Sequence, residues 1–164
     1  MNITFDVNTD EGDKIVVSLF SYPFLPENLT SDKIEIVEIN INREAGYNTI
    51  MPKTFKRIAE KLIQIAEMNE NIIYYYFCDS NEAIPYKRHN DKSTVQCYRD
   101  RLFSSMFLRY SKVAKEIWTD NRVVMNNDEI TYYAHFITRK SHDLFIKEIE
   151  KEINNDFNLI SDSK

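Results

Sequence analysis

The stretch PKTFKRIAEKLIQIAEMNENIIYYYFC, residues 52–78, decides the fold of this chain. Pro52 suits the first position of a helix, and apolar side chains then recur every three or four residues among Lys and Glu, which predicts an amphipathic helix. From Ile72 to Cys78 both parities are apolar, which indicates a central strand covered on both faces. A further strand is predicted at residues 33–41, so the helix is a crossover and the two strands should run parallel.

The N-terminal part reads as a hairpin followed by that first parallel strand. Residues 3–7 and 14–22 are β-prone and flank the turn cluster of residues 9–13, in which a Gly can supply positive φ. Residues 33–41 alternate apolar and polar side chains, but Ile34 and Ile36 do not share a parity with Ile39 and Ile41. This pattern predicts a slip or bulge near Val37.

The C-terminal part reads as helix, hairpin, helix. Ser93 or Thr94 can cap a helix that ends near residues 112–115, and residues 122–125 and 130–138 flank a second turn cluster. The first of these helices is predicted to carry Val95, Tyr98, Leu102, Met106 and Tyr110 on one face, with Phe103 and Phe107 beside them. A last helix opens at Ser141. The expected fold is a single α+β domain over residues 1–158, with a mixed sheet of about six strands and three helices in the order βββαβαββα and a disordered tail at 159–164.

The length and composition limit the kinds of protein that this chain can be. The chain has 164 residues, 43% hydrophobic and 29% charged, which fits one folded domain with one sizeable core. The first thirty residues have no basic start and no cleavage site, and no apolar run approaches the roughly 18 residues that span a bilayer. We therefore expect a soluble, cytoplasmic protein with no membrane partner. His89, His135 and His142 share no metal-ligand spacing, so no metal site is expected.

The first candidate site is the segment REAGYN, residues 43–48, between a strand end and a helix start. Helix N-termini present unpaired N–H groups and a positive dipole end, and a preceding glycine lets the backbone approach a phosphate. A single glycine at such a place also suits a plain turn. The residues alone leave both interpretations open.

This segment and the order of elements around it resemble the GNAT superfamily of acyl-CoA-dependent N-acetyltransferases. That superfamily carries Gln/Arg-x-x-Gly-x-Gly/Ala here, where backbone N–H groups hold the coenzyme pyrophosphate; Arg43 and Gly46 match, and Asn48 departs from the pattern. The resemblance spans roughly residues 33–138. It implies a GNAT-like core that binds acyl-CoA or a similar phosphate-bearing ligand through Arg43, Gly46, Tyr47 and Asn48.

The same resemblance extends to the second helix. Family members have an Asn after the next strand and then a helix with Tyr and Phe five residues apart, and Asn90, Tyr98 and Phe103 are similar to that arrangement. It implies ligand binding by Asn90 and a general-acid role for Tyr98 toward the leaving thiolate. The two helices that the family has between its first two strands are missing here. Glu35 and Glu38 are the available carboxylates for a general base, or are solvated strand residues.

A broader resemblance is to small bacterial α+β proteins of unknown function, in which a Tyr-rich strand ends in Cys-Asp-Ser and precedes an Arg- and Phe-rich helix. Residues 76–80 and 99–107 carry it. It implies no activity. The alternative to an acyltransferase is therefore a non-catalytic protein-interaction domain or a homo-oligomer, and whether the chain is an enzyme stays open.

Residues 86–115 form a basic segment with eight basic and two acidic side chains. Arg88, Arg99, Arg101 and Arg109, interleaved with aromatic residues, form a candidate basic patch for nucleic acid. The net charge of −5 for the whole chain argues against a dedicated nucleic-acid binder. These arginines can equally pair with the acidic first fifty residues or with another copy of the chain.

Overall fold

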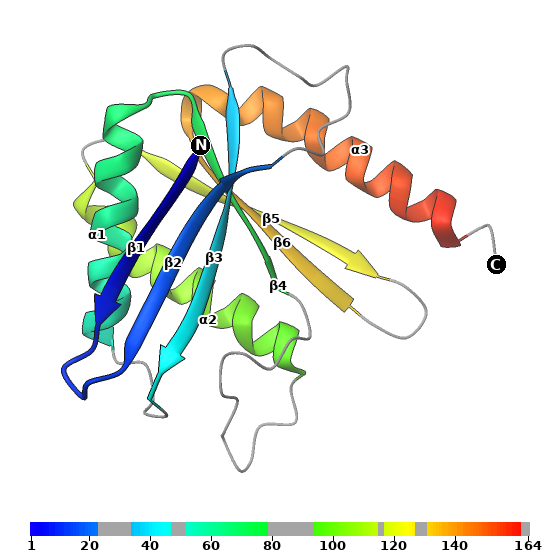
Figure 1. Ribbon diagram of the computed structural model, residues 1–164. Helices are drawn as coiled ribbons and strands as arrows, with labels where there is room; N and C mark the ends of the chain where they lie inside the picture. The colour runs from blue at the N-terminus through cyan, green and yellow to red at the C-terminus, as the bar shows by residue number, and fades with distance from the viewer. Residues whose placement is uncertain (23–33, 47–51, 79–93, 115–116, 127–130, 162–164) are drawn as a thin grey trace.

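The strands form one mixed six-stranded sheet in the order β1-β2-β3-β4-β6-β5 (Figure 1). The computed structural model describes residues 1–22, 34–46, 52–78, 94–114, 117–126 and 131–161. The elements are β1 Asn2–Asn8, β2 Lys14–Ser21, β3 Glu35–Ala45, α1 Pro52–Met68, β4 Ile72–Cys78, α2 Val95–Tyr110, β5 Trp118–Asn126, β6 Thr131–Arg139 and α3 Asp143–Ser161, with short 3-10 turns η2 Ser111–Val113 and η3 Lys140–His142. The predicted single α+β domain and its order of strands and helices are confirmed.

The parallel crossover lies at the centre of the sheet. β3 and β4 pair in parallel and are joined through α1, as predicted, whereas every other neighbouring pair of strands is antiparallel. The parallel pairing is short: it runs from Glu35 opposite Ile72 to Glu38 opposite Tyr75.

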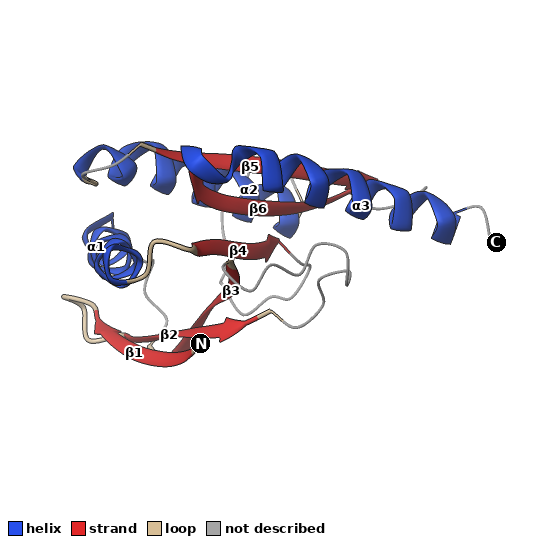
Figure 2. Ribbon diagram, turned by 90° about the horizontal axis from the view of Figure 1, so that it is seen from above, coloured by secondary structure: helices blue, strands red, loops and turns tan. Residues whose placement is uncertain are grey.

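The helices cover the two faces of the sheet unequally. One buried apolar cluster joins α1 and α2 to the strands, and a second, smaller cluster joins α3 to the opposite face. Figure 2, which views the molecule from above, shows α1 beside the strands and α3 lying along the β5–β6 hairpin. In the described part of the chain, no helix is long and apolar enough to cross a membrane.

The prediction of a slip near Val37 is wrong. β2 and β3 pair without interruption from Ile15 opposite Arg43 to Ser21 opposite Val37, and the irregularity lies at the other end, where Lys14 pairs with Ala45. The parity changes because β3 is covered on both faces. Ile34 and Ile36 pack in the α3-side cluster, whereas Val37, Ile39 and Ile41 pack in the cluster under α1 and α2.

Two helix predictions also need correction. The buried side chains of α2 are Gln96, Arg99, Asp100, Phe103, Met106 and Tyr110, so the first half of the helix is rotated from the predicted face. The cause is a polar contact between this half and β5 and β6, which apolar periodicity does not register. α2 ends at Tyr110 rather than at 112–115, and α3 continues to Ser161, so residues 159–161 extend the helix rather than form a tail.

Arg139, the last residue of β6, ties α1 to the sheet. Its Nη1 donates to the carbonyls of Glu70 at 2.8 Å and Asn69 at 3.5 Å, and its Nη2 donates to that of Ala66 at 2.5 Å. Its guanidinium carbon also lies 4.7 Å from the ring centroid of Trp118. The last carbonyls of a helix have no partner within the helix, so one planar side chain satisfies the C-terminal end of α1.

We expect Arg139→Lys to lower the free energy of unfolding by about 2 kcal/mol, because a lysine keeps the charge but cannot present the planar fork of donors. Urea denaturation followed by circular dichroism measures this loss. Lys140→Gln, at the exposed neighbouring side chain, is the matched control and should leave stability within about 0.5 kcal/mol of the original. Equal effects of the two variants would show that Arg139 does not hold α1.

His142, in η3, adds a dependence of stability on pH. Burial and the charge of Arg139 lower the pKa of His142 below its ordinary 6.5, and its Nδ1 is buried without a hydrogen-bond partner. Below pH 6.5 the unfolded chain therefore binds more protons at this residue than the folded chain does, so the free energy of unfolding falls as the pH drops.

We expect His142→Gln to make the protein less sensitive to acid. Urea denaturation at about pH 7.5 and about pH 5.5 should show a smaller loss of stability for the variant than for the original chain, because the glutamine takes up no proton on unfolding. An equal loss of stability between the two pH values in both proteins would show that His142 does not cause the acid sensitivity.

Candidate functional site

The central feature of the candidate site is the place where β3 and β4 separate. Their pairing ends at Glu38 and Tyr75, yet β3 continues to Ala45 along β2, and β4 continues to Cys78 along β6. The two arrows diverge in Figure 1. Among the described strands, none pairs with the facing edges of residues 39–45 and 76–78. We call these two unpaired strand edges the opening; ligands of sheets with parallel strands gather at such carboxyl ends.

Gly46 closes β3 at the rim of the opening. Its φ is +89°, a left-handed conformation that favours glycine, and a Cβ built on it would lie 1.6 Å from Asp13 Oδ1. Asp13, only 1% exposed, belongs to the β1–β2 turn and is held there by a 2.9 Å bond from its N–H to Thr9 Oγ1. Glycine is therefore required at position 46 for two reasons: the positive φ of the turn and the close approach of the buried Asp13 carboxylate.

Among the described candidates for ligand binding, Arg43 has a side chain that is both buried and left with free donors. The side chain is 8% exposed and follows Ile39 and Ile41 on the face of β3 that α1 covers. Its Nη1 lies 3.9 Å from Asp13 Oδ2, beyond hydrogen-bond distance, and its Nε and Nη1 have no hydrogen-bond partner. Buried donors without acceptors are costly, and a guanidinium matches the geometry of a phosphate or carboxylate.

The N-terminal end of α1 is braced against the β1–β2 turn. Arg57 donates to Asp10 Oδ1 at 2.9 Å and to the carbonyl of Asn8 at 2.8 Å, and Lys53 Nζ lies 3.3 Å from Asp10 Oδ2. Hydrogen bonds from Arg57 and Lys53 lower the pKa of Asp10. The same turn thus fixes both the start of α1 and, through Asp13, the glycine that precedes it. Anions are stabilised at such helix starts.

The other predicted site residues are dispersed or lie outside the described residues. Tyr98 is half-buried on the second turn of α2, a helix that begins after Thr94, whose Oγ1 accepts a 3.4 Å bond from the N–H of Cys97. Tyr98 therefore comes from a different element than Arg43 and Gly46. Tyr47, Asn48, Arg88 and Asn90 lie outside the described residues.

The basic patch does not form one exposed surface on α2. Arg99 is only 7% exposed, whereas Arg101 and Arg109 are exposed, and Arg109 lies over the ring of Tyr110 at 5.8 Å. Two exposed arginines more than two turns apart on one helix do not make a groove that follows a nucleic-acid backbone.

Sequence reasoning missed a buried group of charged side chains between α2 and the β5–β6 hairpin. The ring of His135, which is 0% exposed, contacts Asp120 and Asp100, and Asp100 in turn pairs with Arg122. The sequence does carry a signal for it. Asp120 and Arg122 share a parity on β5, so two opposite charges lie on the same face of that strand, with Asp120 half-buried and Arg122 exposed.

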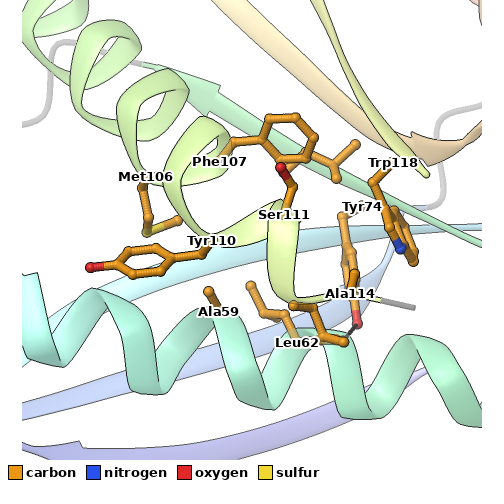
Figure 3. Close-up of a pocket in the computed structure, with 11 residues that line it drawn as sticks. Ala59, Leu62, Tyr74, Met106, Phe107, Tyr110, Ser111, Ala114 and Trp118 are labelled. Carbon is orange, nitrogen blue, oxygen red and sulfur yellow. Dashed lines mark hydrogen bonds between the residues drawn. The ribbon is translucent and has the colours of Figure 1, made fainter. Parts of the chain in front are cut away.

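An apolar cavity of about 60 Å³ lies at the other end of β4 (Figure 3). Its walls come from α1, α2, the segment after α2, and the strands, and include Leu62, Tyr74, Phe107 and Trp118. The Tyr74 hydroxyl donates to the carbonyl of Leu62 at 2.7 Å, so even this polar group is satisfied. The lining carries no charged side chain, which suits a dry packing void rather than a polar reaction.

We expect Gly46→Ala to destabilise the fold far more than Gly12→Ala. Both glycines have positive φ, +89° and +86°, but only the Cβ at position 46 meets Asp13, and nothing lies within 4 Å at position 12. Gly12→Ala should cost about 1–2 kcal/mol, the strain of the conformation alone. Urea denaturation measures both. Adding Asp13→Ala should make Gly46→Ala less costly than it is beside Asp13, and strict additivity of the two substitutions would refute the contact.

Comparison of the chain with known protein families, with curated proteins and with solved structures gave no match. The function is therefore argued from the site itself.

Proposed function

We propose that this chain binds an acyl-CoA, or a similar phosphate-bearing ligand, in the opening between β3 and β4, and that it is a divergent GNAT-like N-acyltransferase. One observation carries the proposal: the only parallel pair of strands in the described sheet separates after four residue pairs, and a buried arginine with free donors follows on the unpaired part of β3. The order of strands and helices along the chain is the feature on which the resemblance noted above rests.

The phosphate end of the ligand is assigned to Arg43 and the start of α1. The guanidinium Nε and Nη1 are buried and lack acceptors, so an anion would satisfy two groups that the folded chain leaves unsatisfied. Gly46 lets the backbone turn at the end of β3, and the first N–H groups of α1, the next described element, have no partner within the helix. Asp13 offsets part of the arginine charge, so the hydrogen bonds from the two free donors would have to supply much of the binding.

The acyl end is assigned to the deeper part of the opening, where residues 76–78 of β4 present an edge that no described strand pairs. In the proposed transfer, an amine nitrogen attacks the thioester carbonyl carbon, the carbon–sulfur bond breaks, and the thiolate takes a proton from the Tyr98 hydroxyl. The amine loses its proton to a base. Glu38, half-buried beside the last parallel pair, is the candidate on β3.

Thermal unfolding with millimolar CoA, acetyl-CoA or inorganic pyrophosphate tests the binding step. A ligand at roughly 100 times its Kd should raise the Tm by at least about 5 °C. Arg43→Gln should lose more than half of that rise relative to its own unliganded Tm, whereas Arg109→Gln, at an exposed arginine, should keep it. If none of the three probes raises the Tm, the proposal is overturned and the non-catalytic interaction domain is favoured. If CoA raises the Tm no more than pyrophosphate does, the site binds anions in general and not the coenzyme.

The transfer step is tested with Tyr98→Phe after a screen for amine acceptors. We expect the variant to keep the rise in Tm with CoA and to lose about a hundredfold in kcat, because the phenol would act only on the leaving thiolate. An unchanged kcat would exclude Tyr98 as the general acid while leaving the binding proposal intact.

A further inference from the structure

The second buried charge group of the molecule lies under the first half of α2. His135 Nδ1 is 2.8 Å from Asp120 Oδ1, and its Nε2 is 3.1 Å from Asp100 Oδ1. Arg122 donates to Asp100 through Nε at 2.5 Å and through Nη2 at 3.0 Å. One imidazole therefore joins a carboxylate on the helix to a carboxylate on β5.

The hydrogen bonds determine how many protons the ring must carry. An ionised carboxylate only accepts hydrogen bonds, whereas a neutral imidazole has one N–H and one acceptor nitrogen. A neutral ring would therefore place a lone pair against a carboxylate oxygen at one of the two contacts. The imidazolium donates at both, and with Arg122 it supplies two positive charges for the two carboxylates, so the group is balanced.

The remaining described groups around His135 add one buried cation, Arg99, and no carboxylate. On β4, the ring of Tyr76 is stacked on the imidazole, with centroids 4.5 Å apart and an interplanar angle of 6°, and burial raises the pKa of its hydroxyl, which stays neutral. On β6, the ring of Tyr133 lies 4.6 Å from the Arg122 guanidinium. On α2, the neighbouring buried charge is Arg99, which adds no carboxylate. In the described part of the chain, no three His, Cys, Asp or Glu side chains are arranged to hold a metal ion.

The first half of α2 depends on this polar contact because it buries little apolar surface. Its inward residues are Gln96, Arg99 and Asp100, whereas the second half buries Phe103, Met106 and Tyr110 in the main apolar cluster. Removing one partner of a buried ion pair leaves the other charge unbalanced and is strongly destabilising. The apolar half would keep its packing when that happens.

We propose that His135 is a buried imidazolium that clamps the first half of α2 to the β5–β6 hairpin, and that loss of its charge releases this half of the helix from the sheet. The clamp is independent of the acyl-CoA proposal. If the clamp exists, the position of α2, and of Tyr98 on that helix, depends on the proton that charges His135.

Long-range proton–nitrogen NMR spectra of the uniformly 15N-labelled protein at about pH 7 test the charge directly, with the His135 signals assigned by their absence in His135→Gln. Both ring nitrogens should resonate as protonated N–H groups. His142, whose pKa is lowered, serves as the internal neutral reference in the same spectrum. One protonated and one unprotonated nitrogen at His135 would overturn the proposal. The variant serves only to assign the signals, and the charge is measured on the original protein.

Hydrogen exchange tests the clamp. In His135→Gln the amides of residues 98–102 should exchange roughly a hundredfold faster, with a smaller change at residues 106–110. Adding Asp120→Asn removes the unbalanced carboxylate and should restore most of the protection. If the double variant is no better protected than the single one, or if the whole of α2 changes uniformly, the ring acts through its packing and the clamp is refuted.

Discussion

The short parallel pairing of β3 and β4 is the constraint on which the rest of the structure depends. A helix crossover forces the two strands to run in one direction, and a right-handed connection places α1 on one face of the sheet. β3 then follows β2 and β4 follows β6, so the twist of the sheet separates them after four pairs. The opening is thus a result of the topology, and the side chains at its rim determine what it can bind.

Much of the fold could be predicted from the sequence because its elements have strong local signals. The limits of β4 and the start of α1 at Pro52 agree with the periodicity of residues 52–78, and the two hairpins follow from turn clusters. The parity of β3 misled the prediction because a strand covered on both faces at Ile36 and Val37 imitates a slip. The inward face of α2 could not be found from apolar spacing, because Arg99 and Asp100 are buried through polar contacts.

The candidate site was predictable only in part. Arg43 and Gly46 were singled out because they lie between a strand and a helix, and both lie at the rim of the opening. The sequence could not show that Asp13 is the reason for Gly46, because the two residues are distant in the chain. Their contact depends on the pairing of β2 with β3. The same holds for His135 and Asp100, which are brought together only when α2 packs on β6.

The two buried charge groups differ in a way that separates structure from function. Around His135, each carboxylate that contacts the ring is matched by a donor, so the group needs nothing from outside and its effect is to hold α2. Around Arg43, the Asp13 carboxylate lies 3.9 Å from Nη1, too far for a hydrogen bond, and Nε and Nη1 stay unsatisfied. A buried cation is retained at a cost in stability unless it is fully hydrogen-bonded. The unsatisfied donors of Arg43 are therefore the observation on which the proposed anion site rests.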